Sequence, residues 1–143
     1  MVREVAEGNF TLLLGHLIGV DHAGHSYSAG HLEIERKLND TEAVIKDIIS
    51  FMDSNTTLIV FGDHGMTDDG NHGGGTANEL RTVFFVYSKR PLLGHELLYD
   101  RALTDQMKQL DLASTIATIL GLALPFQNLG VPLAGLIPTE SLT

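Results

Sequence analysis

At the centre of the chain lies Leu58-Ile59-Val60-Phe61-Gly62-Asp63-His64-Gly65-Met66, an apolar run followed by a polar pair between two glycines. A short run of branched and aromatic residues is typical of a buried β-strand, and a glycine after it lets the backbone turn where the strand leaves the sheet. Asp63 and His64 are therefore expected at the carboxyl end of a strand. In open α/β sheets this is the edge at which ligands bind.

A third polar donor follows at His72, within Gly70-Asn71-His72-Gly73-Gly74-Gly75. Carboxylate and imidazole groups together suit a divalent transition metal, and zinc is the first choice. The sequence has no Cys, which excludes disulfides and thiolate ligands and leaves His and Asp as the metal donors. The central stretch thus predicts half of a metal site.

The composition is that of a folded globular domain. The chain has 143 residues, of which 43% are hydrophobic and 19% charged, and this suits one domain spanning residues 1–143. The formal net charge is −9, whereas a surface for nucleic acid needs clustered Lys and Arg. We therefore expect no nucleic-acid partner, and the acidic balance is compatible with holding cations.

A second apolar run extends from Phe10 to Val20 and ends at the polar sequence Asp21-His22-Ala23-Gly24-His25. A strand buried on both faces, as in a parallel sheet, has this near-continuous apolar character. The run predicts a second buried strand, in which His16 is a core histidine.

Residues 30–53, between the two predicted strands, have the periodicity of an amphipathic helix. Its apolar positions recur three, four and seven residues apart, at Ile34, Leu38, Ile45, Ile48, Ile49 and Met52. Strand, helix and strand form a right-handed βαβ unit by default. With a third strand expected at Thr82–Tyr87, the fold class is α/β with a mostly parallel sheet.

The later part of the chain predicts one more helix. Asp111 is expected to be the N-cap of a helix over residues 112–120, Gly121 ends it, and Pro125 lies beyond. Residues 92–108 are expected to form a loop or a short irregular helix.

Asp21 and His25 lie four residues apart and are expected in a glycine-containing turn, close enough to reach one ion. Together with Asp63 and His64 at a neighbouring strand end, they predict two metal clusters on one sheet edge. Two ions roughly 3.5 to 4 Å apart clamp the attacking and leaving oxygens in phosphoryl transfer.

Other polar residues near these clusters have competing interpretations. His22 either orients a ligand or substrate or is simply exposed, and His31 and His95 are expected on the surface. The backbone of Gly73 and Gly74 is a candidate for substrate binding, although a close approach to the metal site explains these glycines equally well. The hydroxyls nearby belong to Thr67, Ser26 and Ser28, and their spacing does not favour a nucleophile.

Three motifs, taken in order, resemble the alkaline phosphatase superfamily. They are Gly19-Val20-Asp21-His22-Ala23-Gly24-His25, Phe61-Gly62-Asp63-His64-Gly65-Met66-Thr67 and Asn71-His72-Gly73-Gly74. Within the superfamily, the chain is most similar to the GPI ethanolamine phosphate transferases. The stretch from Gln109 to Pro125 is similar to the segment that follows the metal motifs in these enzymes. The resemblance covers roughly residues 10 to 135.

The resemblance implies the later half of an alkaline-phosphatase-like αβα sandwich with two zinc ions. Asp21, His25 and His72 would hold one zinc, and Asp63 and His64 would contribute to the other. The family's Thr or Ser nucleophile comes from an earlier segment, so no catalytic residue is expected in this chain. The chain alone is expected to hold one zinc firmly and to be inactive, and the family's transmembrane helices would lie beyond its end.

The resemblance also implies a reaction and a location. The enzyme would move phosphoethanolamine from phosphatidylethanolamine to a mannose of the GPI precursor. The reaction would take place on the lumenal side of the endoplasmic reticulum membrane. A membrane subunit is a candidate protein partner. The sequons at Asn9, Asn39 and Asn55 favour a secretory lumen, although no signal peptide or membrane-spanning segment is recognisable. The alternatives are a nucleotide pyrophosphatase or phosphodiesterase of the same superfamily, and a truncated metal-binding product without catalytic activity.

Overall fold

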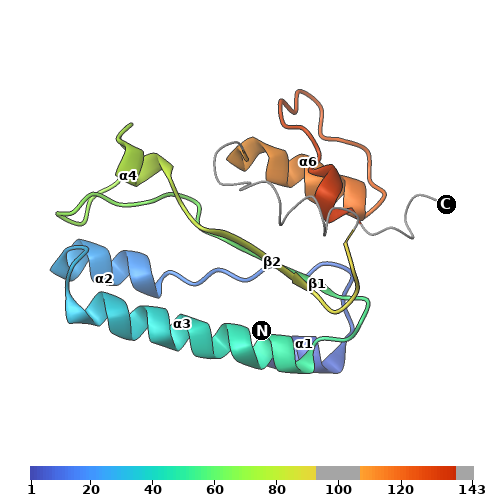
Figure 1. The fold of residues 1–143 in the computed structure, drawn as a ribbon, viewed down its shortest axis with the longest axis horizontal. Coiled ribbons are helices and arrows are strands. Elements are labelled where there is room, and N and C mark those ends of the chain that lie inside the picture. Colours follow the sequence, from blue (N-terminus) through green and yellow to red (C-terminus); the bar gives the residue numbers. More distant parts are fainter. Residues whose placement is uncertain (93–106, 138–143) are drawn as a thin grey trace. The chain divides into compact units, whose positions relative to one another are not determined.

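A computed structural model describes residues 1–92 and 107–137 and divides the chain into two compact units, Met1–Tyr87 and Ser88–Thr143. The first unit contains α1 (Val2–Glu7), α2 (Gly19–Tyr27), α3 (Leu32–Phe51), β1 (Thr57–Phe61), α4 (Ala77–Leu80) and β2 (Phe84–Ser88), whose last residue begins the second unit. The second unit contains α6 (Gln109–Ile119) and the 3-10 helix η2 (Ala134–Leu136) (Figure 1). No helix in the described ranges has the length and apolar character needed to cross a bilayer.

The long helix α3 organises the first unit. Periodicity predicted a helix over residues 30–53, and this is confirmed, although α3 begins at Leu32 and ends at Phe51. Ile48 on α3 and Met52 just beyond it form a buried cluster with Val5 of α1. Helices α1 and α2 both pack against α3, as Figure 1 shows. The apolar stripe of α3 therefore holds the other two helices in place.

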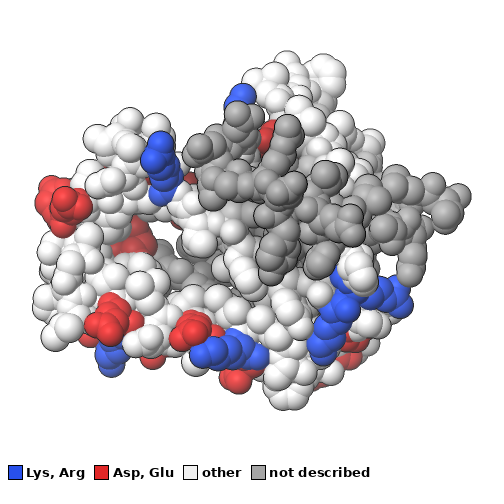
Figure 2. All heavy atoms as spheres, in the orientation of Figure 1, with Lys and Arg blue, Asp and Glu red and all other residues white. Residues whose placement is uncertain are grey.

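The exposed side of α3 carries charges of both signs, which Figure 2 shows along the edge of the molecule where α3 lies. The Arg36 guanidinium donates to the Glu33 carboxylate through both Nε and Nη2, and Lys46 pairs with Glu42 at 2.9 Å. Such exposed pairs at three- and four-residue spacing contribute little to stability. They define the solvent side of the helix more than they stabilise it.

Strands β1 and β2 form a two-stranded sheet, which confirms the central strand and the strand predicted near residues 82–87. The Gly62 N–H, just after β1, donates to the Val83 carbonyl, just before β2, at 3.0 Å. The end of one strand thus meets the start of the other, so the pair is antiparallel. The structure is mixed α/β, and the described residues do not form the parallel sheet that was expected.

The strand predicted from Phe10 to Val20 is wrong. Residues 9–18 contain no regular element, and α2 begins at Gly19. A strand of a parallel sheet needs a hydrogen-bonded neighbour and cover on both faces, and within the described ranges β1 pairs only with β2. Leu12 and Leu14 are accordingly 58% and 81% exposed, His16 is exposed rather than in the core, and the predicted βαβ unit does not form.

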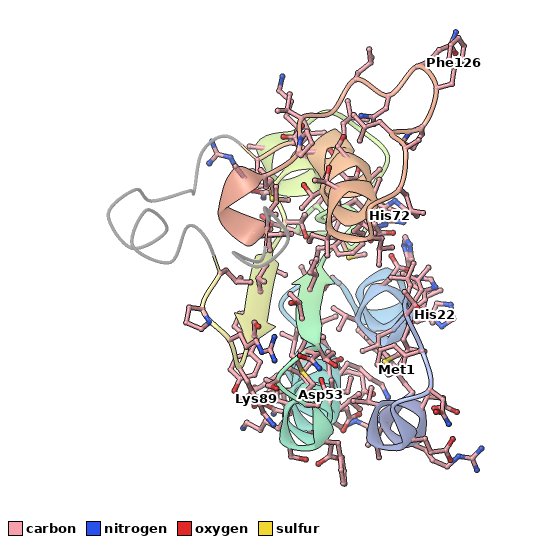
Figure 3. All side chains as sticks on the ribbon, turned by 90° about the vertical axis from the view of Figure 1, so that its right-hand side faces the viewer. Met1, His22, Asp53, His72, Lys89 and Phe126 are labelled. Carbon is pink, nitrogen blue, oxygen red and sulfur yellow. The ribbon has the colours of Figure 1, made fainter. Side chains whose placement is uncertain are left out.

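In the second unit, α6 begins at Gln109 with Lys108 as its N-cap, so Asp111 lies in the first turn and is not the cap that the sequence suggested. The helix ends at Ile119, and Gly121 follows with a left-handed φ of 65° that suits glycine. The loop beyond it reaches the solvent at Phe126, which is 95% exposed and stands at the loop tip in Figure 3.

Buried polar groups tie α6 to the segment that follows it. The Asp111 carboxylate accepts the Lys108 N–H at 3.0 Å and the Val131 N–H at 2.8 Å. Thr115, which is fully buried, accepts the Leu133 N–H at 2.9 Å through its hydroxyl oxygen. These two buried side chains thus accept the N–H groups of Val131 and Leu133 and hold that segment against α6.

The hydrogen bonds from Val131 and Lys108 hold the pKa of Asp111 below its usual value. A carboxyl whose pKa is lowered by folding stabilises the fold fully above its unfolded pKa, about 3.9, and loses this contribution as the pH falls through the folded value. Replacing Asp111 by Asn should therefore destabilise the second unit by about 1–3 kcal/mol near neutral pH, because the two N–H donors lose their charged acceptor.

Urea unfolding followed by circular dichroism across pH 2.5–7 tests this expectation. The difference between the parent chain and Asp111→Asn should shrink toward acid, whereas Asp47→Asn, on the exposed side of α3, should change little at any pH. A difference that stays constant with pH would contradict the role given to the ionised carboxylate.

Candidate metal centre

Asp21 and His25 lie on α2, one helical turn apart, and not in the turn that the sequence suggested. Residues four apart on a helix share a face, so both side chains project on the same side of α2. The distance from His25 Nε2 to Asp21 Oδ1 is 3.5 Å. A helix fixes this spacing more firmly than a turn does.

The loop after β1 brings His72 to that face of α2. Gly70 is buried with a φ of 87°, and a Cβ added there would overlap the carbonyl oxygen of Gly24 on α2. The Ala29 N–H, after α2, donates to the Asp68 carbonyl in the loop at 3.2 Å. The loop therefore lies backbone to backbone against α2, and this contact requires a glycine.

Thr67 closes the same loop on itself. Its single hydroxyl proton is shared between an Asp69 carboxylate oxygen at 2.5 Å and the Asn71 carbonyl at 2.9 Å, and its oxygen accepts the Asn71 N–H at 3.0 Å. Hydrogen bonds from Thr67 and Asn71 lower the pKa of Asp69. The Thr67 hydroxyl is thus engaged in holding the loop that ends at His72.

Asp21, His25 and His72 converge at this contact. His72 Nε2 lies 3.4 Å from Asp21 Oδ1, and one ligand atom from each of the three residues lies within 4.8 Å of the other two. Asp21 Oδ1 is buried and, among the described side chains, is the one buried polar atom without a hydrogen-bond partner. A buried carboxylate oxygen left in this state is costly unless an ion satisfies it.

The two distances from Asp21 Oδ1 suit the ligand spacing of a tetrahedral metal ion. Zinc binds imidazole nitrogen and carboxylate oxygen at about 2.0–2.2 Å, which places two ligand atoms roughly 3.4 Å apart across a tetrahedral angle. The separations of 3.5 and 3.4 Å around Asp21 Oδ1 agree with this value. The three residues are a candidate donor set for one metal ion.

Asp63 and His64 lie beside this set. The His64 ring stacks on the His72 ring, with their centroids 3.8 Å apart, and His64 Nε2 lies 3.7 Å from Asp63 Oδ2. His64 Nδ1 lies 2.9 Å from the Gly65 carbonyl, which can only accept, so this contact favours the tautomer protonated at Nδ1. The Nε2 lone pair of His64 is then available to a metal.

The remaining candidate residues have other surroundings. His22 is exposed on α2 and points outward in Figure 3, and His31 caps α3 by accepting the Glu33 N–H at 3.1 Å. The Gly74 N–H already donates to Glu79 at 2.7 Å, whereas Gly73 is exposed. His95 lies outside the described residues.

Sequence reasoning missed Glu79, which is buried next to the glycine-rich loop. A signal for it was present, because Thr76-Ala77-Asn78-Glu79 has the spacing of a capping box at a helix start. The structure has this capping box at the start of α4. The short helix α4, of 4 residues, therefore begins directly after the glycine-rich loop.

Curated relatives match most of the chain. A protein named GPI ethanolamine phosphate transferase 3 from Schizosaccharomyces pombe is 38% identical over 88% of this chain, and the human GPI ethanolamine phosphate transferase 3, catalytic subunit, is 35% identical over 90%. GPI ethanolamine phosphate transferase 2 from Debaryomyces hansenii is 34% identical over 83%. These matches span only 14%, 12% and 14% of the relatives' own lengths, and no solved structure matched the chain.

The family comparison covers both metal clusters. The family model described as type I phosphodiesterase / nucleotide pyrophosphatase matches residues 2–90, a span that contains all five candidate ligands at positions 21, 25, 63, 64 and 72. This family lies within the alkaline phosphatase superfamily, whose members are generally metal-dependent. The chain belongs to the type I phosphodiesterase / nucleotide pyrophosphatase family, and GPI ethanolamine phosphate transferases are among its homologues.

Proposed function

We propose that this chain carries the zinc ligands of an enzyme that transfers phosphoethanolamine to a mannose of the GPI anchor precursor. One observation carries the proposal: the buried Asp21 oxygen lies between two imidazole nitrogens in a chain whose relatives are named GPI ethanolamine phosphate transferases. Among the family's activities, these names favour transfer to an acceptor alcohol over hydrolysis of a nucleotide ester.

In the proposed site, Asp21, His25 and His72 hold one ion, and Asp63 and His64 supply two ligands for a second. When bound, zinc lowers the pKa of a nucleophilic hydroxyl and offsets the charge that develops on phosphoryl oxygens. The residues of this chain hold the metal-ligand atoms in position. Asp21 Oδ1 is held between its two partners by α2 and the loop, and stacking of His64 on His72 keeps the two ligand sets adjacent.

The nucleophile of the proposed enzyme is a Thr or Ser outside residues 1–143. The Thr67 hydroxyl near the site is already engaged within its own loop, and the chain spans about one-seventh of the relatives' length. We propose that both compact units belong to one alkaline-phosphatase-like αβα catalytic domain. In it, further strands from the rest of the protein would complete a mostly parallel sheet.

The proposed setting is the lumenal face of the endoplasmic reticulum membrane. There, phosphatidylethanolamine would be the donor and the GPI precursor the acceptor, and a membrane partner subunit is part of the proposal. The sequon residues Asn9, Asn39 and Asn55 are all exposed, which agrees with a lumenal, glycosylated domain.

The first prediction of the proposed function concerns metal content. Three protein ligands converge on the first site and only two on the second, so the chain should retain one zinc ion after dialysis and hold a second weakly. His72→Ala should empty the firm site, because two remaining ligands resemble the weak one. Elemental analysis after exhaustive dialysis measures both outcomes.

The matched control is His16→Ala, which removes an exposed histidine from residues 9–18 and should leave the zinc content unchanged. Two firmly bound zinc ions per chain, or a full zinc complement in His72→Ala, would count against the ligand assignment.

The second prediction concerns activity. Residues 1–143 alone should transfer no phosphoethanolamine even with zinc saturating, because in-line transfer needs a hydroxyl placed at the ions. A chimera in which this chain replaces the matching segment of the Schizosaccharomyces pombe relative should restore transfer to a GPI precursor in membranes that lack the endogenous enzyme. Mass spectrometry of the labelled glycolipid detects the product.

In the chimera, Asp63→Ala should abolish transfer, whereas Glu35→Gln, at an exposed position of α3, should not. Robust transfer by residues 1–143 alone would show that the nucleophile lies within them. Hydrolysis of nucleotide esters by the chimera, without transfer to the glycolipid, would instead support the pyrophosphatase alternative.

A further inference from the structure

A buried carboxylate lies next to the metal ligands without being one of them. Glu79, in α4, is only 7% exposed, and it is the only buried acidic side chain within residues 1–92. A carboxylate is expensive to bury unless hydrogen bonds satisfy its oxygens. Its partners therefore indicate what this residue holds in place.

Within the described residues, the Glu79 carboxylate accepts its hydrogen bonds from the loop that follows His72. Oε1 accepts the Gly74 N–H at 2.7 Å, and Oε2 accepts the Thr76 N–H at 3.1 Å and the Thr76 hydroxyl at 2.6 Å. The Thr76 hydroxyl first, and then the two N–H groups, lower the pKa of Glu79, with a further contribution from nearby His72. The ionised carboxylate thus fixes the backbone just after a metal ligand.

Gly74 is matched to this carboxylate. A Cβ at position 74 would lie 2.7 Å from both carboxylate oxygens of Glu79, closer than real Cβ contacts occur. A side chain at position 74 would therefore require the Glu79 carboxylate to shift away from the loop backbone. The close approach of Glu79 is thus a further reason for a glycine at this position.

The main chain of the same residue reaches the other ligand segment. The Glu79 carbonyl accepts the Gly65 N–H at 2.7 Å, and Gly65 directly follows His64. The rings of His64 and His72 stack on each other, as described above. Glu79 thus connects the turn that bears one imidazole with the loop that bears the other.

We propose that Glu79 is a positioning residue for the metal centre, which holds the turns of His64 and His72 so that both imidazoles are presented to the ions. This role rests on the proposed zinc site and adds to it a residue that is not a ligand. Partners of metal ligands fix their orientation, and removing such partners typically weakens metal affinity about 10–100-fold.

A purely structural role is the alternative, in which Glu79 only caps α4. The chain contains a matched control for this alternative, because Asp111 is also a buried acid at the third position of a helix and also accepts backbone N–H groups. Asp111 lies in the compact unit that contains none of the candidate metal ligands. Loss of either acid should destabilise the unit that contains it, but only loss of Glu79 should change zinc binding.

The test compares Glu79→Gln with Asp111→Asn in the full chain. A Gln side chain keeps the shape of Glu79 but turns an NH2 group toward the donors of Gly74 or Thr76. We expect the zinc dissociation constant, measured by competition with a chromophoric chelator, to rise about 10–100-fold in Glu79→Gln and to stay within about twofold in Asp111→Asn. The visible absorption spectrum of bound cobalt should change only in Glu79→Gln.

Urea unfolding of the metal-free chains shows whether each variant is folded. Should Glu79→Gln fail to fold, Gly74→Ala provides the second variant, since it keeps the Glu79 charge but pushes the carboxylate away from the loop. It is expected to weaken zinc binding in the same way.

Zinc affinity and cobalt spectra that match the parent chain, in whichever of these two variants folds, would overturn the positioning role while leaving the proposed zinc site intact. A parent chain that binds no zinc would overturn the proposed site itself, and the role of Glu79 with it.

Discussion

The contact between the loop after β1 and the backbone of α2 is the constraint on which the metal centre depends. Asp21 and His25 are fixed by their helix, but His72 reaches them only because Gly70 lets the loop touch α2. The result is a buried Asp21 oxygen that faces two imidazole nitrogens and accepts no hydrogen bond. Such an arrangement is unfavourable when empty and favourable around a cation, so the fold and the proposed chemistry share one requirement.

Packing within the rest of the first unit supports the contact between the loop and α2. The long helix α3 packs against both α1 and α2, and its buried Ile48 joins Val5 and Met52 in the apolar cluster. This cluster fastens α1 to α3, and the separate contact of α2 with α3 positions the helix that presents two ligands. On the other side of the loop, Glu79 contacts both segments that carry the remaining imidazoles. Apolar packing and one buried carboxylate thus position different ligands of the same site.

Patterns within short stretches of the sequence predicted the helix and strands whose formation depends mainly on those stretches. The periodicity of residues 30–53 predicted α3, and the short apolar runs ending at Phe61 and Tyr87 predicted the two strands of the sheet. The apolar run from Phe10 to Val20 failed because a strand is defined by its neighbours, which a single segment does not reveal. The spacing of Asp21 and His25 is equally compatible with a turn and with a helix.

The site was predictable as a set of residue types and not as a geometry. Motif order brought together the residues that converge on Asp21, but the stacking of His64 on His72 depends on how two distant turns pack. Glu79 was missed although its capping box is a local signal. Asp111 was assigned as the helix cap, because its hydrogen bond from Val131 depends on a donor 20 residues further along the chain.

The central claim is that His25 and His72 bind one ion together. Long-range proton–nitrogen NMR of the histidine side chains, recorded before and after one equivalent of zinc, tests it most directly. The account predicts that the Nε2 signals of His25 and His72 shift together, while those of His16, His22 and His31 keep their positions. Shifts at the exposed histidines alone, or no shift at His72, would contradict it.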